Sequence, residues 1–274
     1  MKQGILVLAF NNDKIDYVKQ AAFVAKRAKQ YLNLPVSIIT DCKNIKYDVF
    51  DNVILLEPDE VYYTRTYSDG TTKKIPLEFK NSMRNLAYDL TPYIETLLID
   101  TDFIISNSKL LNLFEMNHDF MIYNNAVELS GWRSLDEFMF VSDVGPKFYW
   151  ATVIFFRKTL ENEILFNQVK HVKENYDYYQ ALYQMNTNLF RNDHAFSIAI
   201  HTVHGHVAEN SVSIIKEPMF YTTDRDILLD INGDEFLFLI QKENSNDYFP
   251  LKIKGSNVHV MNKFSLDKVI DSYV

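Results

Sequence analysis

The triplet Asp100-Thr101-Asp102 is the part of the sequence best suited to chemistry. In an extended segment, residues i and i+2 point to the same side, so both carboxylates can face one cation. Hard divalent ions such as Mn²⁺ or Mg²⁺ prefer oxygen ligands of this kind and complete their shell with phosphate oxygens and water. A second such triplet, Asp224-Arg225-Asp226, lies in a polar stretch that leads into a hairpin, where a solvated turn is the better interpretation. The first triplet closes a buried strand and is therefore the candidate metal site.

The elements before this triplet predict a parallel sheet. Residues 4–10, 36–40, 53–56 and 96–100 are apolar runs that end at polar residues, as expected of strands buried on both faces. Residues 13–32 have the apolar periodicity of a helix, so strand, helix and strand follow one another as in a βαβ unit. Ligands of open α/β sheets bind at the carboxyl ends of the strands, which is where Asp100 and Asp102 fall.

The elements that follow are more mixed. Residues 61–76 predict a hairpin or mobile loop, and residues 77–90 predict a helix with Lys80 and Arg84 on one face. Further on we expect a strand at 151–156, one long or two short helices at 160–189 and a helix at 193–203 that Asp193 can cap. Asn232-Gly233 predicts a hairpin within 227–240, and Ser265 can cap a closing helix.

Composition limits the classes of protein. The 274 residues carry a formal charge of −8 and include a single cysteine, Cys42, so intramolecular disulfides are excluded and a cytoplasmic location is favoured. The acidic balance counts against nonspecific nucleic-acid binding, although it leaves room for a local basic groove. The first apolar run is too short for an integral membrane segment. No glycine-rich motif of dinucleotide oxidoreductases, P-loop NTPases or α/β-hydrolases occurs.

With no linker or repeat in view, we expect one domain over residues 1–274, with a nucleotide-sugar-binding half at 1–106 and an acceptor-binding half at 107–274. The order of its motifs resembles that of GT-A glycosyltransferases, most closely the retaining family 8 branch that includes glycogenin and bacterial galactosyltransferases. The motifs are the opening strand, Asp41 after the second strand, Lys80-x-x-x-Arg84, the strand running into the Asp-x-Asp triplet, residues 149–156, Asn192-Asp193-His194, and His259…Lys263. Two motifs depart from the family pattern. Ala151-Thr152 replaces a Ser-Gly pair, and His259 and Lys263 are four residues apart rather than six, with no glycine between them.

The resemblance implies an α/β fold of GT-A type, with a Rossmann-like mixed sheet, flanking helices and an extra hairpin in the C-terminal part. It implies a hexosyl- or pentosyltransferase that uses a nucleotide sugar, UDP-linked in this family, with Mn²⁺ or Mg²⁺ as cofactor. The implied metal ligands are Asp100, Asp102 and His259. The implied donor-binding residues are Ala9, Phe10, Asn11, Asn12, Asp41, Lys80, Arg84 and Lys263. Asp193 is the candidate catalytic carboxylate, and the acceptor side would be lined by Trp132, Glu137, Trp150 and Thr152.

The acceptor stays open at this point, as either a glycan or a hydroxymethylated base in phage-type DNA. The basic and aromatic segment 62–76 would then be a lid over the donor, a contact surface for a polyanionic acceptor, or an ordinary solvated hairpin. The sequence is also compatible with a sugar nucleotidyltransferase or a non-catalytic nucleotide-sugar-binding protein of the same fold. A further alternative is a metallohydrolase, whose zinc ligands would come from His194, His201, His204 and His206.

Overall fold

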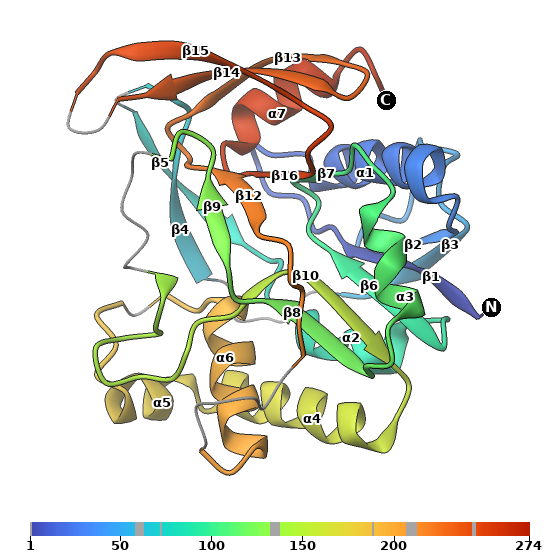
Figure 1. Ribbon diagram of the computed structural model, residues 1–274, viewed down its shortest axis with the longest axis vertical. Coiled ribbons are helices and arrows are strands. Elements are labelled where there is room, and N and C mark those ends of the chain that lie inside the picture. The colour runs from blue at the N-terminus through green and yellow to red at the C-terminus, as the bar shows by residue number, and fades with distance from the viewer. Residues whose placement is uncertain are drawn as a thin grey trace.

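The computed structural model describes residues 2–57, 63–71, 73–131, 138–187, 189–206, 213–242 and 245–274. Over these residues a seven-stranded sheet lies at the centre of the fold (Figure 1). In spatial order its strands are β11 (Ser213–Ile214), β8 (Phe120–Tyr123), β10 (Trp150–Arg157), β6 (Glu95–Ile99), β1 (Gln3–Leu8), β2 (Val36–Thr40) and β3 (Asn52–Leu55). Strands β6, β1, β2 and β3 are parallel, whereas β10 is antiparallel to both of its neighbours. The predicted α/β class with a mixed sheet is confirmed.

Helices cover both faces of this sheet (Figure 1). The alternating side chains of β1 divide between two cores, with Ile5 and Val7 against α1 (Tyr17–Leu32) and Leu6 and Leu8 on the face of the other helices. That second face carries α4 (Leu160–Glu174), α5 (Tyr176–Leu182) and α6 (Asn192–Val203), so residues 160–189 contain two helices rather than one. Shorter helical segments are η1 (Arg84–Leu86), α2 (Ala87–Leu90), η2 (Lys109–Leu111) and α3 (Asn112–Glu115). Among the described residues, no helix is both long enough and apolar enough to cross a membrane.

Two smaller sheets complete the C-terminal part. In the described chain a four-stranded sheet joins β7 (Phe103–Ile104), β16 (Val258–Val260), β12 (Met219–Thr222) and β9 (Ala126–Glu128). A three-stranded sheet joins β13 (Ile227–Asn232), β14 (Glu235–Gln241) and β15 (Tyr248–Lys254), and α7 (Lys263–Ile270) packs beneath it (Figure 1). The hairpin expected around Asn232-Gly233 is confirmed, with a left-handed Gly233 in its turn.

The hairpin expected at 61–76 is also present in its described part, as β4 (Tyr63–Ser68) and β5 (Lys74–Phe79). Its turn is docked against the C-terminal sheet, because the Tyr248 hydroxyl donates a hydrogen bond to the Gly70 carbonyl at 2.7 Å. Gly70 has a left-handed φ of 86°, and a β-carbon there would lie 2.5 Å from Ile227. Only glycine fits this contact, which fixes the end of the hairpin to the body of the protein.

Several local predictions were wrong. Residues 77–79 belong to β5 rather than to a helix, because Leu77 and Phe79 face inward with Glu78 between them, and helical structure begins only at Arg84. Helix α7 is capped by the Asn262 side chain, which accepts from the Ser265 amide, rather than by Ser265. Asp226 is fully buried and accepts bonds from the Thr223 and Gln241 amides, so the second Asp-x-Asp triplet is not a solvated turn.

Candidate active site

The Asp-x-Asp triplet lies where β6 ends, at the carboxyl edge of the parallel part of the sheet. The Asp100 amide donates to the Thr152 carbonyl of β10 at 2.9 Å, and the Phe103 amide closes a turn on the Asp100 carbonyl. The chain then enters β7, which pairs antiparallel with β16 so that His259 lies opposite Phe103. A strand more than 150 residues away in sequence thereby places its histidine beside Asp102.

Asp100, Asp102 and His259 each offer one ligand atom, and these atoms lie within 4.8 Å of one another. Asp102 and His259 are buried, whereas the Asp100 side chain is 35% exposed. Thr152 Oγ1 lies 3.4 Å from His259 Nδ1, while His259 Nε2 faces Asp102 Oδ1 at 3.3 Å. A partner on one ring nitrogen is the usual way in which a protein orients a ligating histidine. Two carboxylates and one imidazole suit a divalent cation, so these residues could hold one.

Two cations already pair with the carboxylates. Lys263, the first residue of α7, donates from Nζ to Asp102 Oδ2 at 2.6 Å, and Arg84 donates to Asp100 Oδ1. Burial raises the pKa of Asp102, but the charges of Lys263 and His259 prevail and hold it well below its usual range. Burial also raises the pKa of Asp100, which Arg84 offsets only in part. The two neighbouring aspartates thus have unequal affinities for a proton, and Asp102 is firmly ionised.

Arg84 has a further unsatisfied group. Its side chain is buried, and Nη1 has no hydrogen-bond partner among the described residues. A buried donor of this kind is costly unless an acceptor reaches it. Because Arg84 lines the same cavity as the aspartates, the orphaned donor fits an anionic or oxygen-rich group of a ligand.

The cavity in front of the cluster has a volume of about 310 Å³. Of the residues predicted to form the site, it brings together Asp100, Asp102, His259, Lys263, Arg84, Asp193, Trp150 and Thr152. Opposite charges balance on its walls, since Arg65 and Arg191 add to Arg84 and Lys263, and Asp193 and Asp224 add to Asp100 and Asp102. The cavity is therefore rich in charge without being strongly acidic or basic.

Asp193 is held in place more firmly than its expected role as a helix cap requires. Helix α6 begins one residue earlier, at Asn192, so Asp193 lies inside the first turn and is not the cap. Its Oδ1 accepts from the Ala151 amide of β10 at 2.9 Å, and its Oδ2 accepts from Arg191 at 3.0 Å. Burial raises the pKa of Asp193, but Arg191 and the Ala151 amide more than offset this and keep it below its usual range. Asp193 is consequently an ionised carboxylate that joins β10 to α6.

Most of the predicted donor residues do not line this cavity. Ala9, Phe10, Asn11 and Asn12 form the loop after β1, Asp41 follows β2, and Lys80 precedes η1 beside Glu78. Ala9 and Phe10 are fully buried. The side chains of Asn11 and Asn12 accept bonds from the amides of Val18 and Ile15, which builds the entry to α1. The loop reaches the cavity through Asn81, whose Oδ1 accepts from the Phe10 amide.

Trp132 and Glu137 lie outside the described residues. Within the described chain the four clustered histidines form no metal-binding group, because His194 is buried against Tyr176 while His201 packs on His206. Several residues of the cavity wall were not among the predicted site residues, and Tyr17, Asn81 and Arg191 are the polar ones among them that lie outside the two Asp-x-Asp triplets, the motif at 192–194 and the segment 62–76. Arg191 carries the one usable signal, a cation two residues before the candidate carboxylate.

No protein-family model and no curated protein matches the sequence. Solved structures do show a similar chain path. The glycosyltransferase GlyE of Streptococcus pneumoniae TIGR4 is 12% identical at a TM-score of 0.46, and the match covers 79% of this chain and 46% of GlyE. The galactosyltransferase LgtC, solved with donor and acceptor sugar analogs, is 10% identical at a TM-score of 0.45, and the match covers 77% of this chain and 72% of LgtC. Mouse xyloside xylosyltransferase 1 is 11% identical at a TM-score of 0.42, and the match covers 76% of this chain and 84% of the mouse protein.

The chain thus spans less than half the length of GlyE.

Proposed function

We propose that this chain is a metal-dependent glycosyltransferase of GT-A type, which moves a sugar from a nucleotide sugar to a hydroxyl group. The observation that carries the proposal is the cluster of Asp100, Asp102 and His259 at the carboxyl edge of the parallel strands, opening onto a cavity. Ligands of open α/β sheets bind at this edge. The acidic cluster with cations around it suits a diphosphate held through a divalent ion.

The cavity suits a diphosphate for a second reason. Arg84 has one guanidinium nitrogen on Asp100 and another without a partner in the described chain, so it can hold a phosphate oxygen without leaving the carboxylate. Lys263 lies beside Asp102 and can turn toward the same group. We propose a UDP-sugar as donor, following the resemblance to family 8, with the base near the loop 9–12 and Asp41.

In the transfer, the bond between the anomeric carbon and a diphosphate oxygen breaks, a bond to the acceptor oxygen forms, and the proton of the acceptor hydroxyl passes to the departing diphosphate. A bound divalent cation would stabilise the charge that develops on the leaving diphosphate. Arg84 and Lys263 would bind that diphosphate and orient it. Asp193, ionised and fixed between β10 and α6, would hold the acceptor hydroxyl or the sugar hydroxyls near the reacting carbon. Trp150 and Thr152 would form the wall behind it.

Nucleotide binding tests the proposal directly. Thermal unfolding is measured with UDP, GDP, CDP and dTDP, each with and without Mn²⁺. A ligand at 100 times its Kd stabilises by about 2.7 kcal/mol, which is roughly 5–10 °C in Tm for a protein of this size. At least one nucleotide should raise the Tm only when Mn²⁺ is present. Asp100→Asn should abolish this effect, and Asp230→Asn, an exposed change on β13, should preserve it.

Release of nucleotide from the matching nucleotide sugar, followed in Mn²⁺, separates a transferase from a non-catalytic binder. The proposal is refuted if no nucleotide stabilises the protein in Mn²⁺, or if Asp100→Asn leaves the Mn²⁺-dependent shift unchanged.

A further inference from the structure

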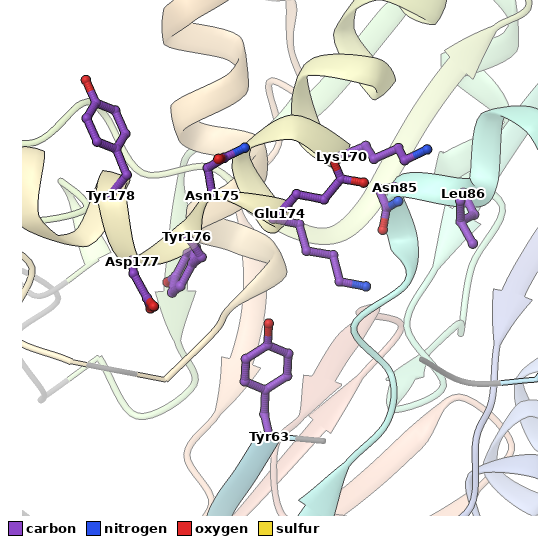
Figure 2. Close-up of a pocket in the computed structure, with 10 residues that line it drawn as sticks. Tyr63, Asn85, Leu86, Lys170, Glu174, Asn175, Tyr176, Asp177 and Tyr178 are labelled. Atoms are coloured by element: carbon purple, nitrogen blue, oxygen red, sulfur yellow. The ribbon is translucent and has the colours of Figure 1, made fainter. Parts of the chain in front are cut away.

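A second cavity, of about 890 Å³, lies outside the site described above. It is bounded by the start of β4, by η1 and by the junction of α4 and α5, and none of its lining residues belongs to the Asp100–Asp102–His259 cluster. Figure 2 shows Tyr63 rising from β4 toward the helices, with Asn85 on η1 facing the same space from another wall. This cavity is large enough for a ligand of several rings, since small-molecule sites usually measure about 300–1,000 Å³.

Asn85 is the residue that points to a ligand. Its side chain lines the cavity and is 93% buried, being only 7% exposed, yet Oδ1 accepts no hydrogen bond from the described residues. Buried side-chain oxygens nearly always have a donor, because an unpaired one loses its bond to water without replacement. A hydroxyl group placed in this cavity would supply the missing donor.

The other lining groups narrow the kind of ligand. Two lysines, Lys170 and Lys173, stand with Glu174 and Asp177 on the same wall, so the formal charges cancel. Tyr178 is 63% exposed at the rim and presents a ring that is apolar on its face and polar at its tip. A polyanion such as DNA is bound through an excess of basic groups, which this wall lacks. Charged side chains of balanced sign beside an exposed ring suit an uncharged, hydroxyl-rich ligand.

The two cavities share a wall. Tyr63 lines the second cavity and Arg65 the first, two residues or about 7 Å apart along β4. Arg84 and Asn85 are likewise neighbours in sequence that face the first and second cavity respectively. Phe190 fixes the wall, because its ring stacks on Tyr63 and its carbonyl accepts from Arg65 at 2.6 Å.

We propose that the second cavity binds a neutral saccharide chain, namely the part of the acceptor that lies beyond the sugar at the reaction centre. The word acceptor rests on the proposed glycosyltransferase function, whereas saccharide binding at this cavity does not. Asn85 would accept from a sugar hydroxyl, the lysines and acids of the wall would bond to further hydroxyls, and Tyr178 would lie against a sugar ring. The acceptor is therefore a glycan rather than DNA.

Direct binding tests this assignment without any transfer reaction. Isothermal titration and saturation-transfer NMR are performed with lactose, maltotetraose, cellotetraose and chitotetraose. We expect at least one to bind, with a Kd raised tenfold or more by Asn85→Leu and by Tyr178→Ala. Tyr178 is exposed on α5, so we expect its variant to fold. Leu160→Ala, which shortens an exposed apolar side chain on α4, is the matched control and should bind normally.

Asp100→Asn separates the two proposals. It should keep oligosaccharide binding, whereas Tyr178→Ala should keep Mn²⁺-dependent nucleotide binding. Loss of nucleotide binding in every form of the protein would refute the transferase and leave the saccharide site standing. The saccharide site is overturned if none of the four oligosaccharides binds, if both cavity variants bind them like the wild type, or if duplex DNA binds in their place and is lost with Tyr178→Ala.

Discussion

Replacing Lys263 with methionine should destabilise the protein strongly, although the residue lies at the mouth of a cavity. Its ammonium is 2.6 Å from Asp102 Oδ2, and the two side chains are only 17% and 4% exposed. Breaking a buried ion pair by removing one partner costs about 3–5 kcal/mol, since a buried charge is left without compensation. His259 remains beside Asp102 at 3.3 Å, so the lower end applies. We expect Lys263→Met to lower the free energy of unfolding by about 3 kcal/mol, or the Tm by roughly 6–12 °C.

The deficit should depend on pH in a defined direction. The pKa of Asp102 in the folded protein lies well below the value of about 3.9 that it takes in an unfolded chain. A depressed carboxyl pKa contributes stability that is present above about pH 4 and is lost as the pH falls through the folded value. The gap between wild type and Lys263→Met should therefore be full at pH 7 and shrink in strong acid. Denaturant unfolding at pH 7 and in steps from pH 4 down to pH 2 measures both quantities.

A divalent cation provides a second measurement on the same variant. Lys263 occupies an oxygen of Asp102 that a cation would need, so its removal eliminates a competitor. Mn²⁺ should raise the Tm of Lys263→Met more than that of the wild type. Lys109→Met is the control, because Lys109 pairs with Glu217 at 3.3 Å on the surface, where both side chains are more than half exposed. If Lys263→Met costs no more than Lys109→Met, the buried pair does not contribute as described.

Three further predictions concern other parts of the molecule. Burial lowers the pKa of His194 to about 4, below the value of about 6.5 that it takes in an unfolded chain. The free energy of unfolding should therefore fall by roughly 2 kcal/mol as the pH is lowered from 7.5 to 5. In denaturant titrations His194→Gln should lose most of this pH dependence. Gly4→Ala would place a methyl group 2.3 Å from the buried Tyr93 ring, so the free energy of unfolding should fall by about 1–3 kcal/mol and the Tm should fall with it. An unchanged Tm would contradict the packing. If the acceptor is a neutral glycan, Lys73→Ala with Lys74→Ala should leave the acceptor KM insensitive to salt; a steep rise in KM with a flattened salt dependence would instead indicate a polyanionic acceptor.

The sequence predicted the elements whose patterns admit one interpretation. The apolar run 36–40 is β2 with the same bounds, because five residues between Pro35 and Asp41 are too few for a helix and fit a strand buried on both faces. Residues 77–79 were misassigned because Phe79 lies at helical spacing from Met83 and Leu86, and it also lies two residues from Leu77, as in a strand. Only pairing with β4 decides between them, and that pairing is not visible in a local pattern.

In the candidate site, too, the residues marked by a local pattern could be predicted and those placed by contacts between distant segments could not. Asp100 and Asp102 could be singled out because a local pattern, the end of a buried strand, places them at a sheet edge. The pairing of Lys263 with Asp102 could not be foreseen, since it follows from the register of β16 on β7 and from the start of α7. Arg191 and Asn81 were also missed. Asn81 contacts Phe10 across 71 residues of sequence, which leaves no local sign, whereas the contact of Arg191 with Asp193 is local and its only signal is a cation two residues before the carboxylate.

The junction of β7 with β16 also sets when the protein can become functional during its synthesis. Asp102 and Lys263 are separated by 161 residues, which a ribosome adds in about 10–30 s. Throughout that interval the strands of the first half can pair and Arg84 can reach Asp100, but Asp102 has neither His259 nor Lys263 beside it. The carboxylates must stay hydrated until β16 and α7 arrive, so the edge of the sheet closes last. A nascent chain of this protein would therefore hold much of its core before the cluster of Asp100, Asp102 and His259 is complete.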